Sequence, residues 1–174
     1  MIISRISTLK RASLKQASLG LAAILGLGVL AMGIAQGDAI AAEQAACTAE
    51  EGAQIEVKVE NVRNSKGLIT AVLYGDDPEG FLKRGQRLDR IRVEANEGET
   101  LLCLKAPAEG RYSIALYHDE NGNKEFDRNF LGIPSEGYGF SNNPGFRFGK
   151  PEQEETLFSV NGSTTKVSIS VLYL

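Results

Sequence analysis

Apolar and polar positions alternate with a period of two along most of the chain after residue 54, and helical periodicity is nearly absent. Alternation of this kind predicts half-buried β-strands. Residues 55–59 and 167–173 show it most clearly, with Ile, Val or Tyr at every second position. Residues 68–74 are apolar on both faces instead. That segment is typical of a central strand that is covered on both sides.

Turn-forming residues separate the apolar runs. The turns fall at residues 64–67, 75–78, 96–98 and 107–110. Further strands are expected at 91–95, 100–106 and 112–116. Strand-sized segments between Gly, Pro, Asn and Asp turns are typical of a β-sandwich. We therefore predict an all-β fold, a single antiparallel β-sandwich of about seven strands over residues 54–174.

The first 42 residues follow a different pattern, which is that of a secretory signal peptide. Four basic residues come first, an uncharged apolar run over residues 17–35 follows, and the small residues Ala39 and Ala41 flank Ile40. We expect cleavage after Ala41 or Ala42, leaving a short extension over residues 43–53 before the sandwich. The mature protein is then periplasmic or secreted, with no stable membrane insertion.

Two other interpretations of the leader stay open. An uncleaved membrane anchor needs roughly 18 apolar residues, and the apolar run is close to that limit. A lipoprotein anchor at Cys47 is the other, although the residues before it lack the large aliphatic side chain that such sites carry.

Charge narrows the range of partners. Removal of residues 1–42 takes away four basic residues and one acidic residue from a chain of net charge −3, which leaves a net charge near −6. An acidic surface repels phosphate backbones, so nucleic acid is excluded as an expected partner. Another envelope component or a small ligand remains, and the sequence does not identify which.

Both cysteines, Cys47 and Cys103, lie in the exported part of the chain. An even number of cysteines in an oxidising compartment predicts one disulfide. The alternative is two separate thiols, because pairing requires Cα atoms within about 7 Å of each other.

The segment 118–151 is rich in Gly, Asn, Asp and Phe and has no strand pattern, so we expect a long ordered loop there. Long loops inside compact domains are usually functional. The motif Pro107-x-x-Gly110-x-Tyr112 resembles the turn and strand of prealbumin-like sandwich domains. The runs His118–Asn123 and Gly132–Asn143 resemble an exported bacterial family, domain of unknown function 2141. The resemblance extends from Ile55 to Tyr173. It implies an exported prealbumin-like or immunoglobulin-like sandwich, and it implies no activity.

The first candidate site is a run of oxygen-bearing side chains at every second position. Its members are Asp119, Asn121, Asn123, Glu125 and Asp127. A short loop can wrap calcium by pointing alternate residues inward, with Glu125 contributing its backbone carbonyl. We therefore predict one calcium ion, with an affinity in the extracellular range of about 10⁻⁴–10⁻³ M.

Two positions depart from the calcium pattern. Lys124 stands where Gly is usual, and Phe130 stands where a bidentate carboxylate is usual. Glu120 or Glu136 replaces that carboxylate only if the fold brings one of them to the loop. The alternative without metal is a turn in which Asp and Asn side chains bond their own backbone.

The second candidate site is an aromatic and glycine-rich loop. Its members are Tyr138, Phe140, Asn142, Asn143, Phe146, Arg147 and Phe148. Exposed aromatic rings of this kind bind small ligands or carbohydrate, since large apolar surface patches mark interaction sites. The alternative is that the rings fold back as a lid on the sandwich.

An enzyme is the least favoured interpretation. His118 is the only histidine, and no Gly-x-Ser-x-Gly elbow accompanies it. A catalytic histidine requires a nucleophile and an orienting carboxylate nearby. We expect instead a hydrogen-bonded structural histidine. The prediction is a non-catalytic binding or structural module of the cell envelope, stabilised by calcium, with a small-ligand or carbohydrate-binding domain as the alternative.

Overall fold

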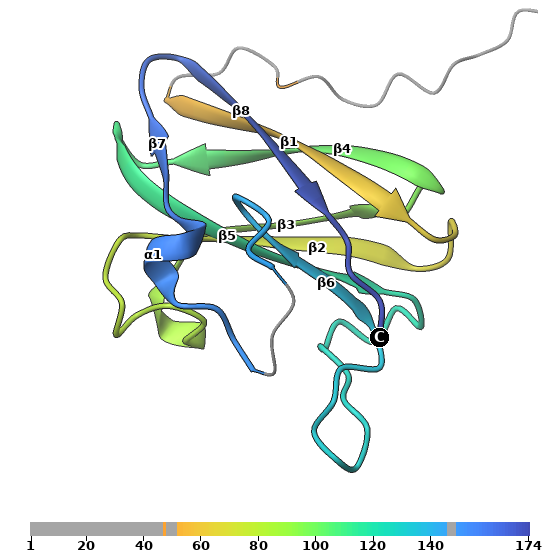
Figure 1. Ribbon diagram of the computed structural model, residues 1–174. Helices are drawn as coiled ribbons and strands as arrows, with labels where there is room; N and C mark the ends of the chain where they lie inside the picture. Colours follow the sequence, from red (N-terminus) through yellow and green to blue (C-terminus); the bar gives the residue numbers. More distant parts are fainter. Residues whose placement is uncertain (1–46, 48–51, 146–148) are drawn as a thin grey trace, which may run out of the picture. The chain divides into compact units, whose positions relative to one another are not determined.

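The computed structural model describes Cys47, residues 52–145 and residues 149–174 of the 174-residue chain. Figure 1 shows its two stacked sheets, one containing β1, β4 and β8 and the other containing β2, β3, β5 and β6. The strands are β1 (Ala53–Val62), β2 (Leu68–Tyr74), β3 (Arg87–Glu94), β4 (Gly98–Ala106), β5 (Gly110–Asp119), β6 (Gly137–Phe140), β7 (Phe158–Val160) and β8 (Thr164–Ser170). Two short helices, the 3₁₀ turn η1 (Arg84–Gln86) and α1 (Gln153–Thr156), lie in the connections.

The core lies between the two sheets and follows the period-two pattern. Every second residue of β1 from Ile55 to Val59 points into it, and Ile55, Val57 and Val59 are fully buried. The second sheet contributes Ile69 and Leu73 from β2, among others. Burying one such side chain contributes roughly 1.5–3 kcal/mol. The alternation in the sequence therefore determines which face of each strand is covered.

The strand order is β4-β1-β8 in the first sheet and β3-β2-β5-β6 in the second. Most neighbours are antiparallel, but β1 and β8 are parallel. The short strand β7 pairs with the beginning of β5. The second sheet therefore has β2 and β5 at its centre, with β6 beside β5.

Two glycines allow β6 to lie against the C-terminal segment. The N–H of Tyr138 donates to the carbonyl of Leu172 at 2.9 Å, and the N–H of Leu172 donates back at 2.7 Å. A Cβ on Gly137 would lie 2.2 Å from the Tyr173 ring, and one on Gly139 would lie 2.8 Å from Ile169. Larger residues at these inward positions would push β6 away from the core.

The structure confirms the predicted all-β sandwich and the doubly covered strand at 68–74, of which six residues are buried. It differs in the segment 118–151, which we expected to be a loop throughout. That segment contains the end of β5 and the whole of β6. Alternating Gly and aromatic residues hide β6 in the sequence, because glycine weakens a strand and is typical of turns.

Cys47 and Cys103 form a disulfide, with their Cα atoms 5.5 Å apart. This confirms the predicted pairing and ties the segment before β1 to β4. The predicted signal peptide, residues 1–42, and most of the extension lie outside the described residues. Within the part that the structure describes, no helix is long and apolar enough to cross a membrane.

Candidate functional site

The outer face of the second sheet, opposite the core, is apolar and aromatic. Val72 and Tyr74 of β2 lie on it and are buried, and Ala115 of β5 and Phe140 of β6 pack against them. The outer face of an antiparallel sheet is normally polar. This face is therefore covered by something other than the second layer of the sandwich.

Two segments cover parts of this face. Phe81 and Leu82, between β2 and η1, pack on Val72 and Tyr74. Phe126, between β5 and β6, packs on Tyr117 with the ring centres 5.5 Å apart. Consecutive aromatic contacts of 5.5–6.1 Å cross the whole face, joining Tyr74, Phe81, Phe140, Tyr138, Phe126 and Tyr117.

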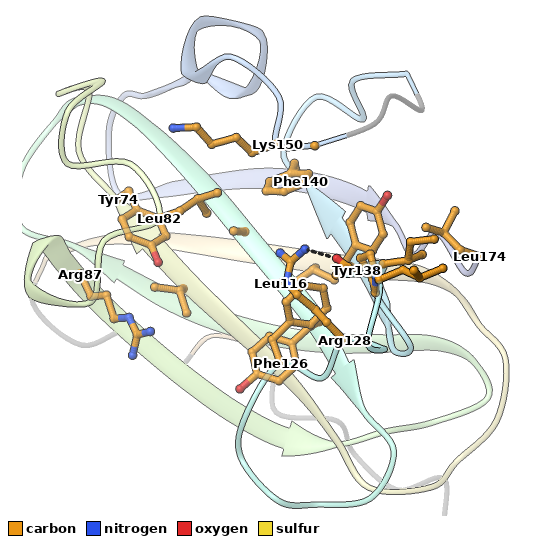
Figure 2. A pocket seen from close by; sticks show the side chains of 18 residues that line it. Tyr74, Leu82, Arg87, Leu116, Phe126, Arg128, Tyr138, Phe140, Lys150 and Leu174 are labelled. Atoms are coloured by element: carbon orange, nitrogen blue, oxygen red, sulfur yellow. Dashed lines mark hydrogen bonds between the residues drawn. The ribbon is translucent and has the colours of Figure 1, made fainter.

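A pocket of about 440 Å³ remains between these segments and the sheet. This size is within the range of about 300–1,000 Å³ for small-molecule sites. Figure 2 shows that the side chains of Tyr74, Phe126, Tyr138 and Phe140 surround it, and that they come from β2, β6 and the connection before β6. Leu131, Ile133 and Pro134 also line it. The pocket is therefore an apolar hollow on an aromatic floor.

The charged side chains that line this pocket are all cationic. Arg87, Arg128 and Lys150 line it, and no Asp or Glu is among the described residues that do. Arg128 lies over the Phe126 ring at 4.9 Å and donates to the carbonyl of Gly132 at 3.0 Å. Arg87 Nε is buried and has no hydrogen-bond partner. The pocket in this acidic protein therefore has a positive rim.

The second candidate site is divided by the structure. Tyr138 and Phe140 line the pocket, and burial raises the pKa of the Tyr138 phenol. Asn142 and Asn143 face elsewhere and hold the turn after β6, donating to the carbonyls of Leu157 at 2.6 Å and Ser168 at 3.1 Å. Phe146, Arg147 and Phe148 lie outside the described residues.

The other residues of the pocket were not predicted from the sequence. Phe126 lies in the segment 118–151 without a motif of its own, and Arg87 stands in a charged segment with no motif. The loss of polar alternation in residues 68–74 was the one available signal, because it predicted a cover on the outer face without identifying its residues.

The first candidate site, which we name the 119–127 loop, is folded by side chain to backbone hydrogen bonds. The two carboxylate oxygens of Asp119 accept the N–H groups of Asn123 at 3.0 Å and Lys124 at 2.7 Å. Asn121 Oδ1 and Asn123 Oδ1 each accept the N–H two residues on. Lys124 has φ of 67°, so the left-handed turn of a calcium loop is present without its glycine. The oxygens form the Asx turns that we considered as the alternative to metal.

Glu136 reaches this loop from the start of β6, whereas Glu120 does not. Asp127 N–H donates to Glu136 Oε2 at 3.1 Å, and Glu136 Oε1 is buried without a partner. Burial, together with the charges of Asp119 and Asp127, raises the pKa of Glu136. Glu120 forms an ion pair with Arg63 instead, which lowers its pKa to about 2.

The described residues contain no group of three His, Cys, Asp or Glu side chains close enough to hold a metal ion as they stand. As it stands, the site consists of the buried Glu136 carboxylate beside a loop that is closed by its own Asx turns.

His118 is fully buried, and both of its ring nitrogens are engaged. Nε2 lies 2.7 Å from the Lys66 carbonyl and must donate to it, since a carbonyl only accepts. In the neutral imidazole Nδ1 is then the acceptor, and it accepts from the Tyr173 hydroxyl, also at 2.7 Å. That hydroxyl in turn accepts the Arg63 N–H at 3.1 Å. The histidine thus joins β5 to the turn between β1 and β2 and to the C-terminal segment.

The family model described as "Uncharacterized protein conserved in bacteria (DUF2141)" matches residues 57–168 of the chain. No curated protein and no solved structure matches it. The matched range contains β2, β5 and β6, the 119–127 loop and Glu136, and it therefore spans both the pocket floor and the acidic loop.

Proposed function

The chain belongs to the DUF2141 family of bacterial proteins, and we propose that it is an exported, non-catalytic module that binds an elongated apolar ligand with an anionic head group. The observation that carries this proposal is the pocket of about 440 Å³ on an aromatic sheet face, with three cationic and no acidic side chains among its described lining residues.

The apolar part of the ligand follows from the floor of the pocket. The aromatic side chains of Tyr74, Tyr138 and Phe140 line the pocket where a sandwich usually presents polar side chains to water. Covering apolar surface contributes about 25 cal/mol per Å², and an alkyl chain or a flat hydrocarbon skeleton would do so without leaving buried polar groups unpaired.

The anionic head follows from the charges. Arg87, Arg128 and Lys150 attract a carboxylate, sulfonate or phosphate, and each charge-assisted hydrogen bond contributes roughly 1.5–3 kcal/mol. A neutral sugar would find few partners, because no Asp, Asn, Glu or Gln is among the described lining residues. The geometry therefore favours an amphipathic anion over the carbohydrate that we considered from the sequence.

The proposed location is the periplasm or the medium. The leader pattern of residues 1–42 and the disulfide between Cys47 and Cys103 both support it, since structural disulfides persist in oxidising compartments. In such a place the pocket would carry or sense an amphiphile, or dock the lipid-like part of an envelope component.

Isothermal titration calorimetry with dodecanoate tests the proposal, with dodecyltrimethylammonium as a probe of the same chain length and opposite charge. We expect dodecanoate to bind with a Kd on the order of 10–100 µM and the cationic probe to bind at least tenfold more weakly. Equal affinities for the two probes would remove the anionic head group from the proposal. No binding of either probe would overturn it.

Substitutions of single charged residues test whether dodecanoate binds at this pocket. Lys150→Gln and Arg128→Gln are expected to weaken dodecanoate binding about tenfold each, the loss of one charge-assisted contact. Arg90→Gln is the matched control, because Arg90 is exposed on the neighbouring strand β3 and does not line the pocket. If all three variants lose affinity equally, general attraction to a cationic surface explains the binding and the pocket does not.

A further inference from the structure

We infer that the 119–127 loop and Glu136 together form a binding site for one calcium ion, in which Glu136 supplies the carboxylate that the loop itself lacks. The loop pattern ends at Phe130 where a bidentate acid is usual, and Phe130 is 95% exposed and points to solvent. Glu136 is brought to the loop by the chain reversal between Asp127 and Ser135. This inference does not rest on the proposed ligand pocket.

The first support is the unpartnered oxygen of Glu136. The side chain is 5% exposed, and Oε2 accepts the Asp127 N–H while Oε1 has no hydrogen-bond partner. A buried carboxylate oxygen without a donor is costly, and native proteins rarely leave one without an ion or water. A cation at this point would satisfy it.

The second support is the local charge. Asp119 is fully buried, Asp127 is partly buried, and both charges act on Glu136. Among the described residues no Lys or Arg side chain is bonded to any of these three carboxylates, whereas Glu120 next to them is neutralised by Arg63. Three carboxylates without a cationic partner are more consistent with a bound divalent ion than with acids that stay close together uncompensated.

The third support is the shape of the loop. Lys124 already adopts the left-handed conformation that a calcium loop needs at its sixth position. The amide groups of Asn121 and Asn123 converge on Asp127 Oδ2, at 2.7 and 2.9 Å. The two amide N–H groups therefore occupy the position beside Asp127 that a cation would take. When calcium binds, the ion replaces these two donors, and the amide groups turn so that their oxygens face it.

The free energy needed to break these contacts limits the affinity of the loop for calcium. The three carboxylates are not within common reach of one ion as the loop stands, so binding must draw Glu136 Oε1 toward Asp119 and Asp127. A loop that first breaks its own Asx contacts binds weakly. We expect a Kd of about 10⁻⁴–10⁻³ M, the range of extracellular calcium modules.

Calcium titration of the disulfide-bonded protein, followed by calorimetry and by thermal unfolding against a chelator, tests the inference. Wild type should gain Tm with calcium, Glu136→Gln should weaken the affinity at least tenfold, and Glu125→Gln should change it less than twofold. Glu125 is the matched control because it is an exposed acid in the same loop whose side chain is not a proposed ligand. The absence of a calcium response in wild type, or equal effects of the two variants, would overturn the inference.

A second measurement needs no variant. The Tyr117 hydroxyl donates to the Lys124 carbonyl at 3.2 Å, so this ring lies beside the loop and would transfer excitation energy to a bound terbium ion. Terbium emission that is excited through tyrosine and displaced by calcium is the expected result. If terbium gives no tyrosine-excited emission, or if calcium does not displace it, the site is not where we place it.

Discussion

The backbone N–H of Asp127 donates to Oε2 of Glu136 at 3.1 Å, although nine positions separate the two residues in the chain. This contact leaves Glu136 Oε1 buried and without a partner. The carboxylate is therefore held in place on one side only, next to the charges of Asp119 and Asp127.

We predict that Glu136→Gln stabilises the protein in the absence of calcium, by about 1 kcal/mol at pH 7. Burial raises the pKa of Glu136 in the folded state above its ordinary value of 4.5, so ionised Glu136 disfavours folding at neutral pH. The penalty is relieved as the pH falls through the folded pKa, and glutamine does not incur it. Urea unfolding with a chelator at pH 7 and pH 4 measures this. A variant that is less stable at both pH values would show that the carboxylate is a purely structural contact.

The pair of Glu120 and Arg63 gives the opposite pH dependence. Arg63 holds the pKa of Glu120 at about 2, below the ordinary value of 4.5. The contribution of the pair is therefore present above pH 4.5 and is lost as the pH falls toward 2. Because Arg63 is 45% exposed, we expect only about 1 kcal/mol. Glu120→Gln should remove this loss from the acid unfolding curve, whereas Glu125→Gln should leave it. An unchanged curve in the first variant would contradict the assignment.

Lys124 adopts φ of 67°, a conformation that costs a residue with a side chain roughly 1–2 kcal/mol. Glycine avoids that cost but loses more chain entropy on folding. The net expectation for Lys124→Gly is a gain of about 0.5–1 kcal/mol in the free energy of unfolding, seen as a higher urea midpoint. Gly145→Ala is the opposite substitution, at a position where a side chain causes no strain, because Gly145 has space around it and no positive φ. A loss of stability in Lys124→Gly would mean that the lysine side chain contributes more than the strain costs.

Tyr173→Phe removes a hydroxyl that serves two partners at once. It leaves the buried Nδ1 of His118 and the N–H of Arg63 without their partner. A buried unsatisfied group costs about 1–3 kcal/mol, and we expect a loss of that size by chemical denaturation. The Tyr138→Phe variant is the control, since no hydrogen bond of its hydroxyl is seen among the described contacts and its ring remains. Equal effects of the two variants would show that the His118 contact is not a distinctive part of the fold.

The disulfide should contribute about 2–4 kcal/mol, because it closes a loop between residues 56 positions apart. Cys47→Ser combined with Cys103→Ser is expected to lower the free energy of unfolding by that amount without changing the dodecanoate affinity. Mass spectrometry of the wild-type protein without reductant should show two hydrogens fewer than the dithiol. Cysteines that remain open to alkylation would contradict the pairing.

The strands with strong alternation were predictable, because the burial of β1 follows its Ile and Val positions one by one. β6 was not, since its alternating glycines make room for Tyr173 and Ile169, and close approach of distant segments leaves no local signal. For the same reason, only part of the candidate site could be predicted from the sequence. Asp119 and Tyr138 stand out in the sequence, but the placement of Glu136, Arg87 and Phe126 depends on tertiary structure.

The claim that the outer sheet face is a ligand pocket is tested most directly by filling it. Ala115 lies on the pocket floor between Val72 and Phe140, and Ala115→Phe would occupy the hollow without touching the core between the sheets. We predict that the variant unfolds within a few degrees of wild type and loses dodecanoate binding at least tenfold in calorimetry. A folded variant that binds dodecanoate as wild type does would place the ligand elsewhere and contradict the proposed function.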